Sequence, residues 1–294
     1  MRTSTLRPAG ISGWVTTLRE QPEVIARYGR NGLRHHVVGP LTAWRRPGGF
    51  AIFHVGRCGS TVLTDLLEQH PDVHSDGETY VRVLEQARAT GRTPHEIAGD
   101  PADYVQRRLR RAGAKWFMFD LKFDHVDRLE GSIERYVADL AAMGVDRFVV
   151  LRRRNLLRKF ASQHMAVQRG AYHSTDATAR RRIRVHLDVE ELSVDGIIAP
   201  IGEHLRRITE QYETFDRIAA DHAVLHLDYE DDLLADPLIG HGKVLDHVGL
   251  RPHVPSIRMQ KLNPYPLAEI VENHADVVAA LTGTPHEWML DADG

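Results

Sequence analysis

Cysteine and long hydrophobic runs are nearly absent from this chain of 294 residues, and their absence excludes several classes of protein. Cys58 is the only cysteine, so the chain forms no internal disulfide and offers no cysteine cluster to a metal. No stretch approaches the roughly eighteen apolar residues that a membrane-spanning helix needs. Residues 1–7 also lack the apolar core of a signal peptide. We therefore expect a cytosolic protein without a membrane span.

An excess of charge of one sign is missing as well. The formal net charge is -2, with 27% charged and 42% hydrophobic residues, which gives no global reason to expect binding to nucleic acid or to an anionic membrane. This length and composition suit a soluble enzyme with a sizeable core. Since no repeat or low-complexity linker appears, we expect one domain over residues 1–294, in which residues 1–49 are an N-terminal extension without an indicated role.

The chain has 18 histidines, but it lacks the spacings that mark metal sites, such as His-Glu-x-x-His. His70 and His74, like His222 and His226, are four residues apart and would share one face of a helix. Pro71 breaks a helix at the first pair, and the second pair straddles an expected junction between a helix and a strand. We expect no structural or catalytic metal.

Apolar runs and helical periodicity alternate along the chain. We expect strands near residues 50–54, 115–123, 147–152 and 223–228, and helices near residues 61–70, 130–143, 155–168, 201–220 and 232–248. This alternation predicts the α/β class, with a mainly parallel sheet flanked by helices on both faces. Ligands of such sheets bind at the carboxyl ends of the strands.

The junction between the first strand and the first helix has the composition of a phosphate-binding loop, Phe53-His54-Val55-Gly56-Arg57-Cys58-Gly59-Ser60-Thr61. The N–H groups and the dipole at the start of the helix attract an anion, Gly59 lets the backbone approach it, and Ser60 and Thr61 add hydroxyl donors. A Walker loop has a lysine directly before its Ser/Thr, but here Gly59 stands there. The basic residue is Arg57, whose guanidinium suits bidentate contact with phosphate or sulfonate. The loop predicts a phosphorylated ligand other than an ordinary nucleoside triphosphate.

This loop resembles the 5′-phosphosulfate loop of sulfotransferases that use 3′-phosphoadenosine 5′-phosphosulfate (PAPS), particularly the bacterial and Golgi-type branches, where Arg-Ser-Gly-Ser/Thr-Thr is common. Cys58 stands where the family has serine. The resemblance implies a P-loop sulfotransferase fold, PAPS as co-substrate, no metal, and a small-molecule hydroxyl acceptor such as a sugar, lipid or secondary metabolite. It also implies that residues of the loop bind the cofactor: Arg57, Cys58, Gly59, Ser60 and Thr61.

A second element is the strand that ends in Arg152-Arg153-Arg154, before a helix from Leu156. In sulfotransferases, an arginine at this place and a serine eight positions later bind the 3′-phosphate of the cofactor, and Arg154 and Ser162 have that spacing. The alternative is that the arginines only solvate the start of the helix.

Two later segments also resemble the family. The run Asp228-Tyr229-Glu230-Asp231-Asp232-Leu233 resembles its Tyr-Glu-Asp-Leu segment, with Asp232 as an extra residue, and implies that Tyr229 contributes to cofactor binding. Asn273 and the later Gly283-Thr284 resemble the closing helix and tail of many bacterial members.

Sulfuryl transfer to a hydroxyl needs a base for the acceptor's proton and cations for the growing negative charge. By resemblance, Glu78 is our choice of base, and Lys122 and Arg57 are the cations; otherwise Glu78 would be an exposed carboxylate at a helix start. For Lys122, an equally weighted alternative is that it has no catalytic role and extends its ammonium group to water at the end of a strand. His125 is the second candidate base, one residue further from the lysine than in the histidine-base branch.

Other interpretations stay open at this point. A P-loop kinase would use Asp120 as its magnesium ligand, but it also needs the missing lysine. A protein that binds nucleotide without catalysis is a third alternative. The polar segment 170–200 carries a basic and an acidic cluster and is expected to form an amphipathic surface helix, although the family often places acceptor-binding or lid structure there.

Overall fold

The structure is a computed structural model that describes residues 39–169, 182–259 and 265–291. Most of the N-terminal extension, and residues 170–181 of the polar segment, lie outside the described residues.

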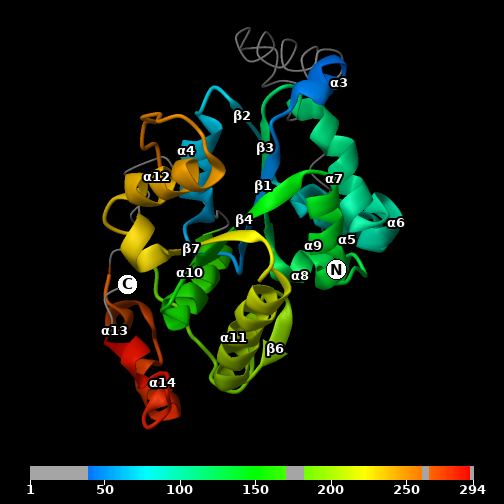
Figure 1. Cartoon of the computed structure of the whole chain (residues 1–294). Coiled ribbons are helices and arrows are strands. Elements are labelled where there is room, and N and C mark those ends of the chain that lie inside the picture. Colours follow the sequence, from blue (N-terminus) through cyan, green and yellow to red (C-terminus); the bar gives the residue numbers. More distant parts are fainter. Residues whose placement is uncertain (1–38, 170–181, 260–264, 292–294) are drawn as a thin grey trace, which may run out of the picture.

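The central element is a sheet of five strands in the order β2-β3-β1-β4-β7 (Figure 1). Its strands are β1 (Gly49–His54), β2 (Val73–Glu78), β3 (Trp116–Lys122), β4 (Val145–Arg152) and β7 (Ala223–Asp228). All four pairings are parallel, so all five carboxyl ends lie at the same edge of the sheet. The structure confirms the α/β class with a parallel sheet flanked by helices, and all four of the expected strands.

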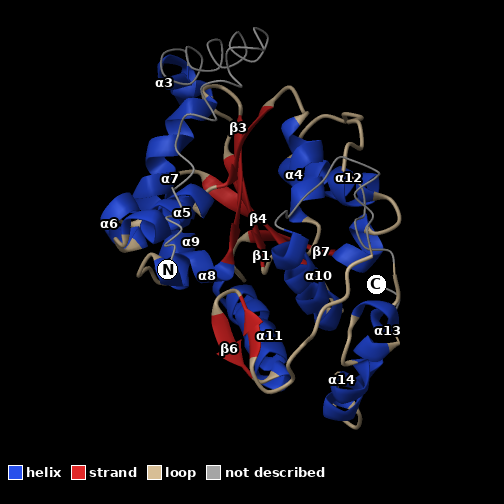
Figure 2. Cartoon of the chain, turned by 180° about the vertical axis from the view of Figure 1, so that it is seen from behind, coloured by secondary structure: helices blue, strands red, loops and turns tan. Residues whose placement is uncertain are grey.

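Helices cover both faces of the sheet (Figure 2). One face carries α4 (Ser60–Glu68) and α12 (Pro237–Val248). The other carries α5 (Val81–Thr90), α6 (Pro94–Ala98), α7 (Pro101–Leu109), α8 (Phe123–Arg128), α9 (Ile133–Ala142), α10 (Leu156–Arg169) and α11 (Ile201–Ile218). Two shorter helices, α13 (Leu267–Ile270) and α14 (His274–Leu281), follow near the C-terminus. Within the described ranges, no helix has the length and apolar composition needed to span a membrane.

Side-chain alternation along β1 divides the core into two clusters. Ala51 and Phe53 belong to the larger cluster, under α5 to α9 and α11, whereas Phe50 and Ile52 belong to the cluster under α4 and α12. Phe53 packs against Phe215, with ring centroids 4.3 Å apart. The strand is therefore anchored on both faces directly before the phosphate loop begins.

Several helices begin at side chains that cap their first turn. Thr93 and Glu96 form a capping box at α6. Asp100 accepts hydrogen bonds from two N–H groups of α7, and Asp236 accepts one from Leu238 at 2.9 Å in α12. The Asp236-Pro237 pair is thus a helix start, with proline at the first helical position.

The structure differs from the sequence expectations in three places. Strand β2 is not among the expected strands, since its residues Val-His-Ser-Asp-Gly-Glu lack apolar alternation; it is an edge strand that pairs only with β3. Helices α5 to α8 were not expected. The part of the polar segment that the structure describes, 182–200, is not a surface helix but contains a hairpin of β5 (Leu192–Val194) and β6 (Ile197–Ala199).

The hairpin was detectable from its turn. Asp195 and Gly196 connect the two strands with φ of 53° and 85°, and two positive φ values are typical of the Asp-Gly turn in a two-residue hairpin. Leu192 and Val194 are fully buried, while Ile197 and Ile198 are exposed. The short alternation of apolar residues, together with Asp-Gly, therefore predicts strands rather than a helix.

A buried histidine makes the stability of this fold sensitive to acid. His241 of α12 is 2% exposed, and its Nε2 has no hydrogen-bond partner among the described residues. Burial, with smaller contributions from His253 and His70, lowers the pKa of His241 from 6.5 to about 4. The unfolded chain binds this proton from about pH 6.5 downward, so the contribution to stability is complete above pH 6.5 and is lost as the pH falls towards 4.

We predict that lowering the pH from 7.5 to 5 reduces the free energy of unfolding through His241 by about 2 kcal/mol. The His241→Leu variant, which has no ionisable group at this place, should lose correspondingly less stability over the same range. Urea denaturation of both proteins at the two pH values measures the difference. Equal losses in the two proteins would contradict the prediction.

Candidate functional site

The phosphate loop lies between β1 and α4 in a conformation that requires its glycines. Gly56, Arg57 and Gly59 have φ of 75°, 56° and 86°. Gly59 stands at the N-cap of α4 and has no side chain to cap the first turn. A Cβ there would also lie 2.9 Å from Cδ2 of Tyr229, so glycine leaves room for the tyrosine ring.

A buried histidine connects the loop to the neighbouring strand. The N–H of Gly56 donates to Nδ1 of His54 at 2.9 Å, and Nε2 of His54 lies 3.1 Å from Oδ2 of Asp120. Because Nδ1 accepts a hydrogen bond, the proton of the ring lies on Nε2 and is donated to the carboxylate. His54 and Asp120 are 1% and 4% exposed. Asp120 therefore holds the loop, a role that sequence reasoning missed.

A cavity of about 930 Å³ opens at the carboxyl edge of the sheet. It is lined by the loop and the start of α4, by the ends of β2 and β3, by α10 and by the turn between β5 and β6. A volume of this order is at the upper end for small-molecule sites. Cys58 is fully buried in the apolar cluster under α4, and its side chain is not part of the lining.

Three arginines line one part of this cavity. Nε of Arg57 donates to Oγ of Ser162 at 3.1 Å, and Nη1 of Arg153 donates to the backbone oxygen of Arg57 at 3.0 Å. The Arg153 guanidinium also lies 4.7 Å from the ring centroid of Tyr229. Arg153 and Arg158 are only 9% and 6% exposed. Three guanidinium groups, a serine hydroxyl and a helix N-terminus thus converge, a combination that suits phosphate or sulfonate groups.

Arg154 does not belong to this group. Its Nη1 and Nη2 donate to both carboxylate oxygens of Asp231, at 2.9 and 2.6 Å, and its side chain is absent from the cavity lining. The structure therefore does not bring Arg154 and Ser162 together. Side chains of an extended segment alternate in direction, so of two consecutive arginines Arg153 points inward, which spacing alone does not reveal.

The segment around Tyr229 forms a π-helix, Tyr229–Leu233, in which the N–H of Leu234 donates to the oxygen of Tyr229 at 2.8 Å. Asp232 accepts hydrogen bonds from the N–H of Asp228 at 2.9 Å and from Lys243 at 2.7 Å. Glu230 accepts from the N–H groups of Arg154 and of the next residue, each at 3.1 Å. This segment thus fixes the start of α10 and keeps Tyr229 at the loop.

Three of the four catalytic candidates meet at the other part of the cavity. Oε1 of Glu78 lies 3.7 Å from Nζ of Lys122 and 3.6 Å from Nε2 of His125. They come from the ends of β2 and β3 and from the first turn of α8. Glu78 ends a strand and does not begin a helix, and its side chain is 31% exposed. A carboxylate, an ammonium group and an imidazole are therefore within reach of one another beside the loop.

Lys122 lies directly against the phosphate loop. A Cβ at Gly56 would be 2.9 Å from Cε of Lys122, so the glycine leaves room for the lysine stem. The loop has no lysine of its own, and β3 thus supplies one from the neighbouring strand.

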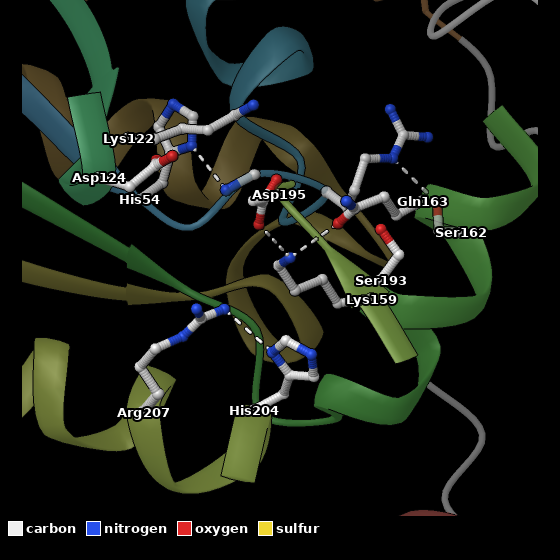
Figure 3. A network of polar contacts seen from close by, with 12 residues as sticks. His54, Lys122, Asp124, Lys159, Ser162, Gln163, Ser193, Asp195, His204 and Arg207 are labelled. Carbon is white, nitrogen blue, oxygen red and sulfur yellow. Dashed lines mark hydrogen bonds and ion pairs between the residues drawn. The ribbon is translucent and has the colours of Figure 1, made fainter. Parts of the chain in front are cut away.

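The hairpin turn is fixed by a buried ion pair. Lys159 of α10 is 0% exposed, and its Nζ lies 3.0 Å from Oδ2 of Asp195 and 3.0 Å from Oε1 of Gln163 (Figure 3). Burial lowers the pKa of Lys159. For Asp195, burial alone would raise the pKa, but Lys159 and Lys122 outweigh it and the pKa is lowered. Asp195 lines the cavity beside Lys122, and sequence reasoning did not find this pair because its members lie on different elements.

No family model matches the chain, and no curated protein matches it. Among solved structures, the chain is similar to the crystal structure of a sulfotransferase from Alicyclobacillus acidocaldarius, with 14% identity and a TM-score of 0.44 over 85% of this chain and 97% of that one. In the described part of the chain, no three His, Cys, Asp or Glu side chains are grouped as metal ligands.

His125 is expected to remain neutral when ordinary histidines are protonated. It is 2% exposed, and burial, followed by the nearby Lys122, lowers its pKa well below 6.5. We predict that its ring resonances show no protonation as the pH falls through 6.5, and that Lys122→Met raises its pKa because a cation is removed. Nitrogen-detected NMR titration, with the signals assigned through His125→Gln, measures both. Titration of His125 near pH 6.5 in the unaltered protein would contradict the prediction.

Proposed function

We propose that this protein is a sulfotransferase that moves the sulfuryl group of PAPS to a hydroxyl of a small-molecule acceptor. The observation that carries the proposal is the meeting of Glu78, Lys122 and His125, within 3.7 Å, at the cavity that the phosphate loop lines. A candidate base and a cation thus stand beside a site for phosphate groups, which is the arrangement that group transfer to a hydroxyl needs.

The cavity residues fit the anionic groups of PAPS. The loop, Arg57 and Ser162 are proposed to hold the 5′-phosphosulfate, and Arg153 and Arg158 to hold the remaining phosphate charge. In this proposal Arg153 takes the place that spacing gives to Arg154. Tyr229 covers the loop and stacks on Arg153. PAPS supplies the activated sulfuryl group when bound.

The acceptor's proton is proposed to pass to the carboxylate of Glu78. Oε1 is buried against Lys122 and His125 and accepts no hydrogen bond from the described residues, whereas the side chain as a whole is 31% exposed and lines the cavity, where an acceptor hydroxyl would lie. As the proton leaves, the acceptor oxygen bonds to sulfur, and the bond from sulfur to the phosphate oxygen breaks. Lys122 and Arg57 offset the negative charge that remains on the phosphate side. His125, a neutral ring beside Glu78, orients the base.

The kinase alternative finds less support in the same geometry. Its candidate magnesium ligand, Asp120, is 4% exposed and accepts a hydrogen bond from His54. The loop also lacks the lysine that a P-loop kinase uses at the terminal phosphates. A nucleotide-binding protein without catalysis would bind the same ligand but would transfer nothing, so turnover distinguishes it.

Nucleotide binding tests the proposal directly. We predict that 3′-phosphoadenosine 5′-phosphate, the desulfated cofactor, raises the thermal unfolding midpoint of the protein and that ATP with magnesium does so much less. A ligand at a hundred times its dissociation constant stabilises by about 2.7 kcal/mol. The Arg153→Met variant should lose at least tenfold in affinity, since a charge-assisted hydrogen bond contributes about 1.5–3 kcal/mol.

Arg154→Met is the matched control, because it removes a neighbouring arginine that points to Asp231. It should bind the desulfated cofactor nearly as the unaltered protein does. If Arg154→Met loses binding and Arg153→Met keeps it, the residue that binds the 3′-phosphate is Arg154 and not Arg153. Stabilisation by ATP with magnesium alone would favour the kinase.

The base is tested by Glu78→Gln. This change keeps the shape of the site and the affinity for the desulfated cofactor but removes the proton acceptor, so turnover with labelled PAPS should fall by roughly 10²–10⁴-fold. The acid limb of the pH–rate profile should disappear with it. His125→Asn should reduce turnover much less. An inactive His125→Asn enzyme beside a normally active Glu78→Gln enzyme would make His125 the base.

A further inference from the structure

At the amino ends of the strands, opposite the cavity, an exposed surface combines large apolar side chains with arginines. It is formed by α3 (Gly39–Thr42), by the 3-10 helix η2 (Ala43–Arg45) and by a second 3-10 helix, η3 (Arg110–Ala112). Both α3 and η2 pack against η3. Next to this contact, Nη1 of Arg46 donates to the backbone oxygen of Leu109 at 3.1 Å. In Figure 1, α3 lies at the top, at the amino ends of the strands.

Two large apolar side chains are exposed on this surface. Trp44 is 82% exposed and Leu41 is 71% exposed. Arg45 lies beside the Trp44 ring, with its guanidinium 5.7 Å from the ring centroid. Arg110 is exposed and Arg111 half-buried. We call these five residues the amino-edge patch.

The segments of chain that form the patch contain charged residues of positive sign only, one of which, Arg108, is paired with Asp76 of β2. Residues 39–49 and 107–115 contain six arginines and one lysine but no aspartate or glutamate. Residues 1–49 have eight arginines and two glutamates, a formal excess of six positive charges. Since the whole chain has a net charge of -2, the remaining residues carry an excess of eight negative charges. The positive charge is thus concentrated in the N-terminal part of the sequence.

We propose that the amino-edge patch binds an anionic lipid surface. The arginines are attracted to the charged headgroups, while Trp44 and Leu41 enter the boundary between headgroups and acyl chains, as in other interfacial segments. Nucleic acid would also attract the arginines, and a base could stack on Trp44, but the aliphatic Leu41 would then stay exposed to water, whereas a lipid surface accommodates both apolar side chains. The cavity lies at the other edge of the sheet and remains open to water when the patch is bound.

Vesicle co-sedimentation of the full chain tests this proposal without any assumption about its activity. The protein should sediment with vesicles containing phosphatidylglycerol and not with vesicles of phosphatidylcholine alone, and salt should weaken the binding. Each arginine near such a surface contributes on the order of fivefold, so Arg110→Gln/Arg111→Gln should lower partitioning by roughly twenty- to thirtyfold. Leu41→Ser/Trp44→Ser should lower it at least tenfold, because the apolar insertion is lost.

Two control variants match these changes elsewhere on the surface. Arg135→Gln/Arg206→Gln removes two exposed arginines outside the patch, and Ile197→Ser/Ile198→Ser removes two exposed apolar side chains of β6. Neither should change partitioning by more than about fivefold, the contribution of one arginine. Thermal midpoints of all variants show that each one folds.

Three results would overturn the proposal. The first is the absence of sedimentation with phosphatidylglycerol vesicles. The second is binding that the β6 control lowers and the two patch variants do not. The third is a protein that shifts a random DNA duplex in a gel but does not bind vesicles, which would assign the patch to nucleic acid.

Discussion

Parallel pairing of β1 with its two neighbours is the constraint on which the proposed site depends. The register places His54 of β1 opposite Lys122 of β3, and Glu78 of β2 opposite Asp120 of β3. Because the strands run in the same direction, residues that are far apart in sequence meet at one edge of the sheet. A slip of one residue in any pairing would turn these side chains to the opposite face.

The hydrogen bonds of His54 add a second constraint at the same edge. Three of the four residues from Gly56 to Gly59 have positive φ, one of them the non-glycine residue Arg57, and such a conformation persists only when its surroundings hold it. The bond from Gly56 to His54, and from His54 to Asp120, supplies this support from below the loop. A buried polar network of this kind has to be fully paired to be stable, which explains why the carboxylate of Asp120 accepts a hydrogen bond from His54.

The two groups of arginines differ in a way that suits different partners. Arg153 and Arg158 are almost fully buried and held by contacts with backbone oxygens, so their guanidinium groups are preorganised for one small ligand. Arg45 and Arg110 are exposed on short helices at the opposite edge. Flexible, solvated charges of that kind suit an extended anionic surface better than a defined pocket.

Residues with a local signal could be predicted from the sequence. An apolar run followed by glycines, Arg57 and two hydroxyl residues predicted the strand, the loop and the helix. The apolar run before Lys122 likewise predicted β3, which brings this lysine to the carboxyl edge of the sheet. The Asp195-Gly196 turn also carried a local signal, because a two-residue hairpin needs two positive φ values that these residues tolerate.

Only the tertiary structure decided which side chains enter the cavity. In the arginine run, Arg153 points inward and Arg154 outward because Asp231 and Glu230 hold the latter, and these partners lie more than seventy residues away. Strand β2 is polar, so pairing with β3, not periodicity, makes it a strand. The ion pair of Lys159 with Asp195 likewise joins a helix to a separate hairpin. Local propensity and spacing contain no information on such contacts, because they form only when distant segments pack against each other.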